Sequence, residues 1–136
     1  LKRRISTKVK VTFVNDLPEE RQMNINRNLF EWVIENICKN AVDAMTGVGA
    51  LKVRIFVLNK QEIAIDISDT GKGISRGNWQ KVFKPGISTK KRGWGLGLTL
   101  AKRIIEEYHG GKLFVKNSEV GKGTTFRIIL KQPSTS

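Results

Sequence analysis

The segment from Ile63 to Ile74, Ile-Ala-Ile-Asp-Ile-Ser-Asp-Thr-Gly-Lys-Gly-Ile, places the strongest constraint on how this chain folds. Ile63, Ile65 and Ile67 alternate with smaller or polar residues, which is the two-residue period of a half-buried strand. Asp69 continues the isoleucine face where this strand ends. A carboxylate in that place is costly unless hydrogen-bond donors meet it. The segment therefore predicts an anionic acceptor at the floor of a pocket, with an aspartate that merely starts a turn as the alternative.

Length and composition indicate one domain. The 136 residues suffice for a single core, no apolar run is long enough to span a bilayer, and the one cysteine, Cys38, excludes an internal disulfide. Cys38 falls within a helical pattern, so we expect it to be a packing residue. The chain begins at Leu1 without a signal peptide. We expect residues 1–136 to be one domain excised from a longer, cytoplasmic chain, with residues 131–136 as a frayed tail.

A formal net charge of +13 is the compositional outlier. It favours nucleic acid, anionic lipid or a phosphate ligand as a partner. Basic residues gather near the amino end and again beside the later glycines, and neither group is interleaved with aromatic residues as a single-strand stacking surface would be. We interpret the first group as solvated surface and the second as attracting phosphate. The groups are Lys2, Arg3, Arg4, Lys8 and Lys10, and then Lys84, Lys90, Lys91 and Arg92.

Periodicity predicts five strands and two long helices. Alternation favours strands over residues 8–14, 52–58, 62–69, 112–116 and 124–130, the second and third joined as an antiparallel hairpin. Apolar residues at three- and four-residue spacing predict one helix over about 28–45. They predict a second helix that the glycine run 93–98 opens and that ends at about Tyr108. A short helix is a further option around 79–83. The irregular stretch 75–93 is long enough to be a working loop, typically a lid.

The first helix carries a polar signal along one border of its apolar stripe. Asn36, Asn40 and Asp43 lie together there, whereas Glu31 and Glu35 point largely away. A solvated helix edge is one reading, but Asn and Asp are poor interior helix formers and so require a reason. Mg²⁺ takes one or two oxygen ligands from a protein and completes its shell with phosphates and waters. Asn40 can offer an amide oxygen, and Asn36 can hold a water.

A glycine run, Gly93-Trp94-Gly95-Leu96-Gly97-Leu98, opens the second helix. Glycines that let backbone N–H groups converge directly before a helix form an anion site. The spacing matches neither the P-loop nor the dinucleotide fingerprint, and the run follows a loop where both of those motifs follow a strand.

Five segments in order resemble the motifs of the ATP-binding catalytic domain of sensor histidine kinases, in the superfamily of Hsp90, MutL and DNA gyrase B. They are Asn36–Ala41, Asp69–Gly73, Phe83–Pro85, Gly93–Leu98 and Gly121–Phe126. The resemblance implies a Bergerat-type ATP-binding fold: an α+β two-layer sandwich with a mixed, mostly antiparallel sheet of about five strands and about three helices on one face.

The resemblance also implies roles for individual residues. Asp69 would accept from the adenine amino group, Asn40 would ligate Mg²⁺, and Asn36 would lie near the phosphates, over which a lid carrying Lys90 closes. Catalysis would thus involve Asn36, Asn40 and Lys90. The other residues that we expect to contact ATP are Asp43, Gly71, Gly73, Ile74, Phe83, Thr89, Gly93, Gly95, Leu96, Gly97, Leu98, Thr124 and Thr125.

Two departures from the family pattern carry information. Gly86 and Ile87 replace the aromatic residue that follows the Phe-x-Pro motif, and Asn36 stands where the hydrolytic members carry a glutamate that serves as general base. An amide cannot take a proton from water. We therefore expect phosphoryl transfer to a protein side chain, although Glu35 offers an alternative base. Open alternatives are a serine-directed kinase or ATPase of the same superfamily, or a basic nucleic-acid-binding module.

The resemblance places the phosphoacceptor histidine on a separate dimerisation domain and implies a downstream response regulator. The one histidine here, His109, precedes two glycines at a helix end and is better interpreted as a cap. We expect a monomeric fragment that binds ATP and Mg²⁺ without phosphorylating itself, does not bind nucleic acid, and comes from a kinase that is possibly anchored in a membrane.

Overall fold

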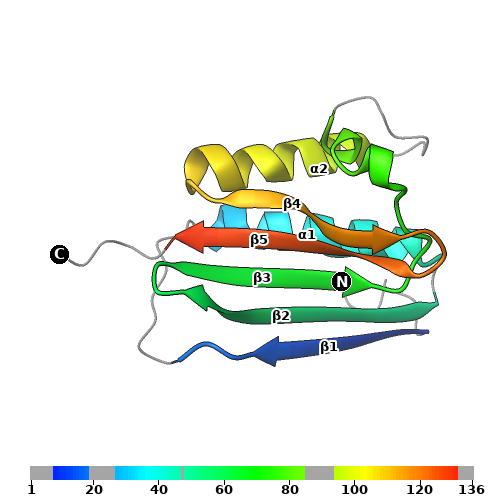
Figure 1. The fold of residues 1–136 in the computed structure, drawn as a ribbon, viewed down its shortest axis with the longest axis horizontal. Coiled ribbons are helices and arrows are strands. Elements are labelled where there is room, and N and C mark those ends of the chain that lie inside the picture. Colours follow the sequence, from blue (N-terminus) through cyan, green and yellow to red (C-terminus); the bar gives the residue numbers. More distant parts are fainter. Residues whose placement is uncertain (1–7, 19–26, 47, 85–93, 132–136) are drawn as a thin grey trace.

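The computed structural model describes residues 8–18, 27–46, 48–84 and 94–131. Five strands form one sheet in the order β1-β2-β3-β5-β4 (Figure 1). β1 runs parallel to β2, and every other neighbouring pair is antiparallel. The strands are β1 (Val9–Asn15), β2 (Gly49–Asn59), β3 (Glu62–Asp69), β4 (Lys112–Glu119) and β5 (Gly123–Lys131).

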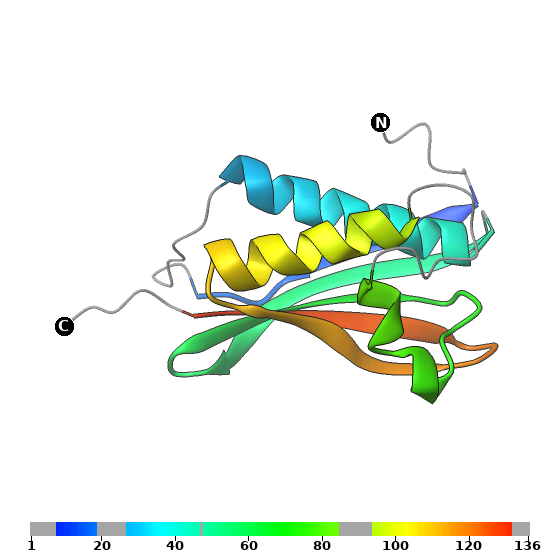
Figure 2. The same ribbon diagram turned by 90° about the horizontal axis from the view of Figure 1, so that it is seen from above.

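The helices form a second layer on one face of the sheet and leave the other face open (Figure 2). α1 (Arg27–Ala44) and α2 (Trp94–Arg103) run side by side, and α2 continues into a π-helical segment, η4 (Ile104–Tyr108). The short helix predicted around 79–83 is a 3₁₀ turn, η3 (Lys81–Phe83), and a second 3₁₀ turn, η2 (Arg76–Asn78), precedes it. The predicted two-layer α+β fold is confirmed. Within the described residues, no helix has the length and apolar character that crossing a membrane requires.

The core lies between β3 and the helices. Ile63, Ile65 and Ile67 are each at most 1% exposed, and the facing residues Val33 and Ile37 of α1 are fully buried. The alternation of the strand and the period of the helix thus predicted the correct faces, because both elements bury one side against the same core.

The first strand departs from the expected pattern. Val9 is buried, but Val11 and Phe13 on the same face are 54% and 60% exposed. β1 is an edge strand, and a cavity of about 460 Å³ separates Phe13 from the facing residues of α1. Burial of an alternating strand depends on what lies above it, and the sequence of the strand does not contain that information.

The end of the second helix was predicted correctly, and the end of the last strand was not. The second helix ends at Tyr108 as predicted, where Gly110 has φ +66° and the N–H of Gly111 donates to Ile105 O at 2.9 Å. His109 Nδ1 lies 3.0 Å from Ile104 O, which fits the predicted capping role. Lys131 was assigned to the tail, but it belongs to β5, where it pairs with Glu62; residues 132–136 lie outside the described residues.

Cys38 is expected to be chemically inert in the folded protein. Burial, and to a lesser extent the charge of Glu35, raise the pKa of its thiol to about 11. Since the thiolate is the reactive form, few molecules carry it at neutral pH. We expect a disulfide reagent at pH 7.5 to modify Cys38 much more slowly in the folded protein than in denaturant. Equal rates in the two conditions would show that α1 does not protect the thiol.

Candidate nucleotide-binding site

Asp69 is the last residue of β3 and lies on the helix-covered face, only 7% exposed. Its Oδ1 accepts a hydrogen bond from the backbone N–H of Gly71 at 2.8 Å. Burial raises the pKa of this carboxyl above its usual value, and the backbone N–H groups of Gly71 and Thr124 lower it in part. The two readings of Asp69 from the sequence therefore combine, because the residue both starts the turn and remains a buried acid.

The turn after Asp69 is held rigidly by backbone contacts on two sides. The N–H of Lys72 donates to Ala44 O at 3.1 Å, and the N–H of Gly121 donates to Lys72 O at 2.8 Å. A Cβ on Gly71 would lie 2.7 Å from the backbone of Ala44, and Gly73 has φ +79°. The close packing at Gly71 and the positive φ of Gly73 are thus enough to explain why glycine occupies both positions. Their predicted role of letting a base approach stays a prediction.

Ser118 links this turn to the sheet and was missed by the sequence analysis. Its Oγ accepts from the N–H of Ile74 at 2.7 Å, donates to Gly123 O at 3.0 Å, and lies 2.7 Å from Thr124 Oγ1. A bulge in β4 between Val115 and Asn117 shifts the register. Simple alternation from Val115 points Asn117 inward, whereas the bulge turns Ser118 inward instead.

We expect Ser118→Ala to loosen the turn that carries Gly73 and Ile74. The half-buried N–H of Ile74 loses its acceptor, which corresponds to about 1–3 kcal/mol of unfolding free energy. A denaturant titration of the variant measures this loss. Ser75→Ala is the matched control, because the Ser75 hydroxyl accepts from Asn78 at an exposed position. Equal stability of the two variants would contradict the linking role of Ser118.

The polar residues of α1 differ sharply in their surroundings. Asn40 is 7% exposed, and its Oδ1 is buried without a hydrogen-bond partner among the described residues. Asn36 Nδ2 donates to Trp32 O at 2.8 Å, and a Cβ on Gly97 would lie 3.0 Å from Asn36 Oδ1. Gly97 therefore lets α2 approach Asn36 closely. Asp43 is exposed in the last turn of α1.

The donor set on α1 fits a magnesium ion. A buried oxygen without a partner is costly, and a cation or a cation-bound water satisfies it. The described residues contain no group of three His, Cys, Asp or Glu side chains that could hold a metal by themselves. Mg²⁺ in nucleotide sites uses one or two protein oxygens and takes the rest from phosphates and water, which is what Asn40 can provide.

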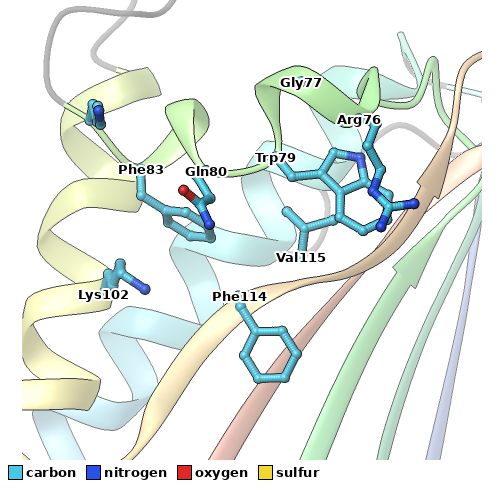
Figure 3. Close-up of a pocket in the computed structure, with 9 residues that line it drawn as sticks. Arg76, Gly77, Trp79, Gln80, Phe83, Lys102, Phe114 and Val115 are labelled. Carbon is cyan, nitrogen blue, oxygen red and sulfur yellow. The ribbon is translucent and has the colours of Figure 1, made fainter.

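Phe83 lies within the stretch 75–93 that was predicted to form a lid, and it packs into the core. It is 8% exposed, it meets Phe126 edge to face at 6.0 Å between ring centroids, and Thr99 Oγ1 donates to its carbonyl at 2.6 Å. Figure 3 shows Phe83 beside a cavity of about 750 Å³ between η2, η3, α2 and β4. Of the residues predicted to contact nucleotide, that cavity contains only Phe83, so it is not the predicted site.

Thr124 and Thr125 lie on opposite faces of the sheet. Thr124 pairs with Asp69 and is 5% exposed on the helix side, whereas Thr125 Oγ1 lies 2.9 Å from Ser68 Oγ on the open side. Both threonines nevertheless line one cavity of about 280 Å³ together with Asp69, and their predicted place beside the adenine stays a prediction. Neighbouring residues in a strand point in opposite directions, so only one of them can face a given layer.

The remaining predicted residues lie at the start of α2, in the turn after β3, or outside the described chain. Leu98 is 1% exposed, Gly97 contacts Asn36, and Gly95 and Leu96 belong to the first helical turn. The helix begins at Trp94, as the glycine run predicted. Thr89, Lys90 and Gly93 lie outside the described residues. Ile74 is half-buried and held by Ser118.

Glu31 and Glu35 lie away from the asparagines. Both are exposed and line a separate cavity of about 460 Å³ together with Phe13, Phe30 and Ile34, next to the edge strand β1. The helical projection predicted this separation. The position of α1 that faces Gly97 thus carries an amide, and the two glutamates face a different cavity.

The fold is a two-layer α+β domain that can hold a polar ligand at one end of its sheet. The acid at the end of β3, the glycine turn and an α1 amide oxygen with no partner in the described part of the chain meet there. The chain belongs to the family described as histidine kinase-, DNA gyrase B-, and HSP90-like ATPase, whose model matches residues 25–134. Within this family, it is an ATP-binding domain of the sensor histidine kinase type.

Relatives and solved structures agree with this membership. The chain is 34% identical to sporulation kinase E of Bacillus subtilis over 92% of its length, and 38% identical to the histidine-protein kinase AtoS of Escherichia coli over 89%. It spans only 16% and 20% of those two proteins. The catalytic domain of histidine kinase ThkA superposes with a TM-score of 0.79 at 26% identity, covering 96% of this chain and 83% of that one. The mycobacterial sensor histidine kinase MprB, at 22% identity and TM-score 0.83, covers 98% of this chain and 89% of that one and shares the fold.

Proposed function

We propose that this domain binds Mg²⁺-ATP and donates the γ-phosphoryl group to a histidine on a dimerisation domain that lies outside the chain. The observation that carries the proposal is the buried Oδ1 of Asn40, which has no hydrogen-bond partner among the described residues and lies on the helix that faces α2. Within an ATP-binding family, an oxygen of this kind is a suitable ligand for the metal ion that accompanies the nucleotide.

The residues divide the work between base and phosphates. Asp69, buried at the end of β3, accepts from the exocyclic amino group of adenine. Asn40 supplies an oxygen to Mg²⁺, and Asn36 lies near the phosphates; the bound ion neutralises charge that develops on the transferred group. The protein's own contribution is positioning. The roles of Lys90 and Thr89 in a lid follow from the resemblance.

Transfer to a protein side chain, and not hydrolysis, is the expected outcome. Hydrolysis needs a base that orients and deprotonates water, whereas Asn36 carries an amide and Glu35 lines a different cavity. We expect this chain to hydrolyse ATP very slowly. Glu35→Gln should change the rate of hydrolysis less than about twofold, because Glu35 does not act as the general base. Fast hydrolysis that Glu35→Gln abolishes would establish the ATPase alternative.

Further proposals concern the whole kinase. The matched relatives are much longer than this chain, so we propose a cytoplasmic catalytic domain within a larger kinase that serves a response regulator. The isolated domain is expected to be a monomer. Because His109 caps η4 with its Nδ1 beside Ile104 O, it is not the acceptor.

Two measurements test the proposal. Calorimetric titration with Mg²⁺-ATP should show one saturable site, and labelled phosphate should appear on a supplied histidine-containing dimerisation domain in acid-labile form. No label should appear on His109 when the chain is incubated alone. Acid-stable label on a serine substrate would favour the serine-directed alternative, and the absence of saturable ATP binding would contradict the proposal altogether.

A further inference from the structure

The nucleotide site does not account for the net charge of +13, and part of that charge lies on the open face of the sheet, which Figure 1 views directly. Strand register decides which side chains point to this face, because paired residues share a side. On the described strands the basic residues outnumber the acidic residues Glu62, Asp66 and Glu119. The basic residues are Lys10, Lys52, Arg54, Lys112, Arg127 and Lys131, with Lys116 in the bulge of β4.

Ion pairs neutralise the centre of this face. Arg127 donates through Nε and Nη2 to the two carboxylate oxygens of Asp66 at 2.7 and 2.8 Å, and Arg54 Nε lies 3.1 Å from Asp16 Oδ2. Both guanidinium groups also lie over the Phe56 ring, at 4.3 and 5.3 Å from its centroid. The arginines and the aromatic ring of the centre are therefore already engaged.

Five exposed lysines remain around this centre, and we call them the lysine ring: Lys10, Lys52, Lys112, Lys116 and Lys131. None of them forms an ion pair with a described acidic residue. They come from four of the five strands. Lys10 and Lys52 lie near the beginnings of β1 and β2. Near the opposite end of the sheet, Lys112 lies across from Ile129, and Lys131 lies across from Glu62. The charge is spread over a plane and does not follow a track.

The surroundings of the lysine ring decide which kind of partner fits. Protein interfaces are built on exposed aromatic and apolar residues and are depleted in lysine. The large exposed apolar side chains of the described residues lie elsewhere, on the helix side, in the turns, or on the helices: Val11, Phe13, Val48, Leu100, Tyr108 and Val120. A nucleic acid strand needs stacking rings or a continuous basic groove, and Phe56 is covered by arginine.

We propose that the open face of the sheet binds an anionic lipid bilayer through the lysine ring. A bilayer presents negative charge over a plane, which matches lysines distributed around a neutral centre, and such contacts need no apolar anchor. The helix layer and the nucleotide site then face away from the lipid, because the helices cover the other face of the sheet (Figure 2).

Sedimentation with lipid vesicles tests this inference. The 136-residue chain should bind vesicles of equal parts phosphatidylglycerol and phosphatidylcholine, fail to bind pure phosphatidylcholine, and lose binding as salt rises. Each lysine near an anionic surface contributes about fivefold in binding. Lys52→Gln combined with Lys112→Gln should therefore weaken binding by about 25-fold.

A matched pair of substitutions on the other layer is the control. Lys81→Gln with Arg103→Gln removes the same charge from η3 and α2 and should change vesicle binding less than about twofold if the open face is the contact. Mg²⁺-ATP titration confirms that both double variants remain folded and functional. Equal weakening in the two pairs would show general charge attraction and overturn the proposal, as would tighter binding to duplex DNA than to vesicles or no vesicle binding at low salt.

Discussion

Asp69→Asn is expected to weaken adenine nucleotide binding by about 10- to 150-fold, because a hydrogen bond to a charged group in a buried site contributes about 1.5–3 kcal/mol. The same change should not lower the stability of the nucleotide-free protein. Burial raises the pKa of Asp69, so folding favours its protonated form, and the ionised form costs stability at neutral pH. An amide keeps the acceptor for the N–H of Gly71 without that cost.

The pH dependence follows from the same shift. Stability that comes from protonated Asp69 is fully present below its ordinary pKa and is lost as pH rises through its raised folded-state pKa. The advantage of Asp69→Asn over the wild type in unfolding free energy should therefore be larger at pH 7 than at pH 3.5. Denaturant titrations at both pH values measure it. An advantage that grows toward low pH would contradict a raised pKa.

Asp66→Asn is the matched control, with the same chemical change three residues earlier on the opposite face of β3. Asp66 forms the two hydrogen bonds to Arg127, so its replacement should lower stability and leave nucleotide affinity within about twofold. The two substitutions thus have opposite expected signatures. Loss of nucleotide binding in both would indicate that the sheet, and not the carboxylate of Asp69, was disturbed.

Asn40→Ala should separate metal-dependent from base-dependent binding. We expect phosphoryl transfer to fall by about 100-fold or more, the usual effect of losing one group that stabilises developing charge, while adenosine binds as before. Because Asn40 Oδ1 has no partner among the described residues, its removal should not destabilise the nucleotide-free protein appreciably. Transfer rates at several Mg²⁺ concentrations, together with adenosine titration, measure both parts.

Asn28→Ala, at the exposed beginning of α1, controls for general effects on the helix. It should leave transfer and Mg²⁺ dependence unchanged. If Asn40→Ala also retained its Mg²⁺ dependence, the assignment of Asn40 as a metal ligand would be wrong. If it lost adenosine as well, the effect would lie in the shape of the pocket and not in the cation.

Much of the fold could be predicted from the spacing of apolar residues within single strands and helices. The isoleucine alternation predicted β3 and the buried position of Asp69, and the apolar stripe of α1 separated Asn36 and Asn40 from Glu35. These succeed because a strand and a helix each have a fixed repeat that shows which side is buried. The exposure of Phe13 was not predictable, since it depends on how closely α1 packs against the edge strand.

The candidate site was only partly predictable. Thr124 and Thr125 are equivalent as a motif, but the register of β5 against β3 pairs Thr124 with Asp69 and Thr125 with Ser68, on opposite faces of the sheet. Ser118 became a linking residue through a bulge in β4, and a bulge leaves no periodic signal in the sequence. Both outcomes are set by pairing between segments far apart in the chain.

The sequence by itself determined the two-layer class, the order of the motifs and the identity of the buried acid, because these depend on patterns within single elements. Only the tertiary structure decided that Asn40 Oδ1 is buried without a partner in the described ranges, and that lysines from four strands surround one neutral centre. Solvation and charge density depend on which atoms meet in space, and residues distant in sequence are brought together only when the sheet is assembled.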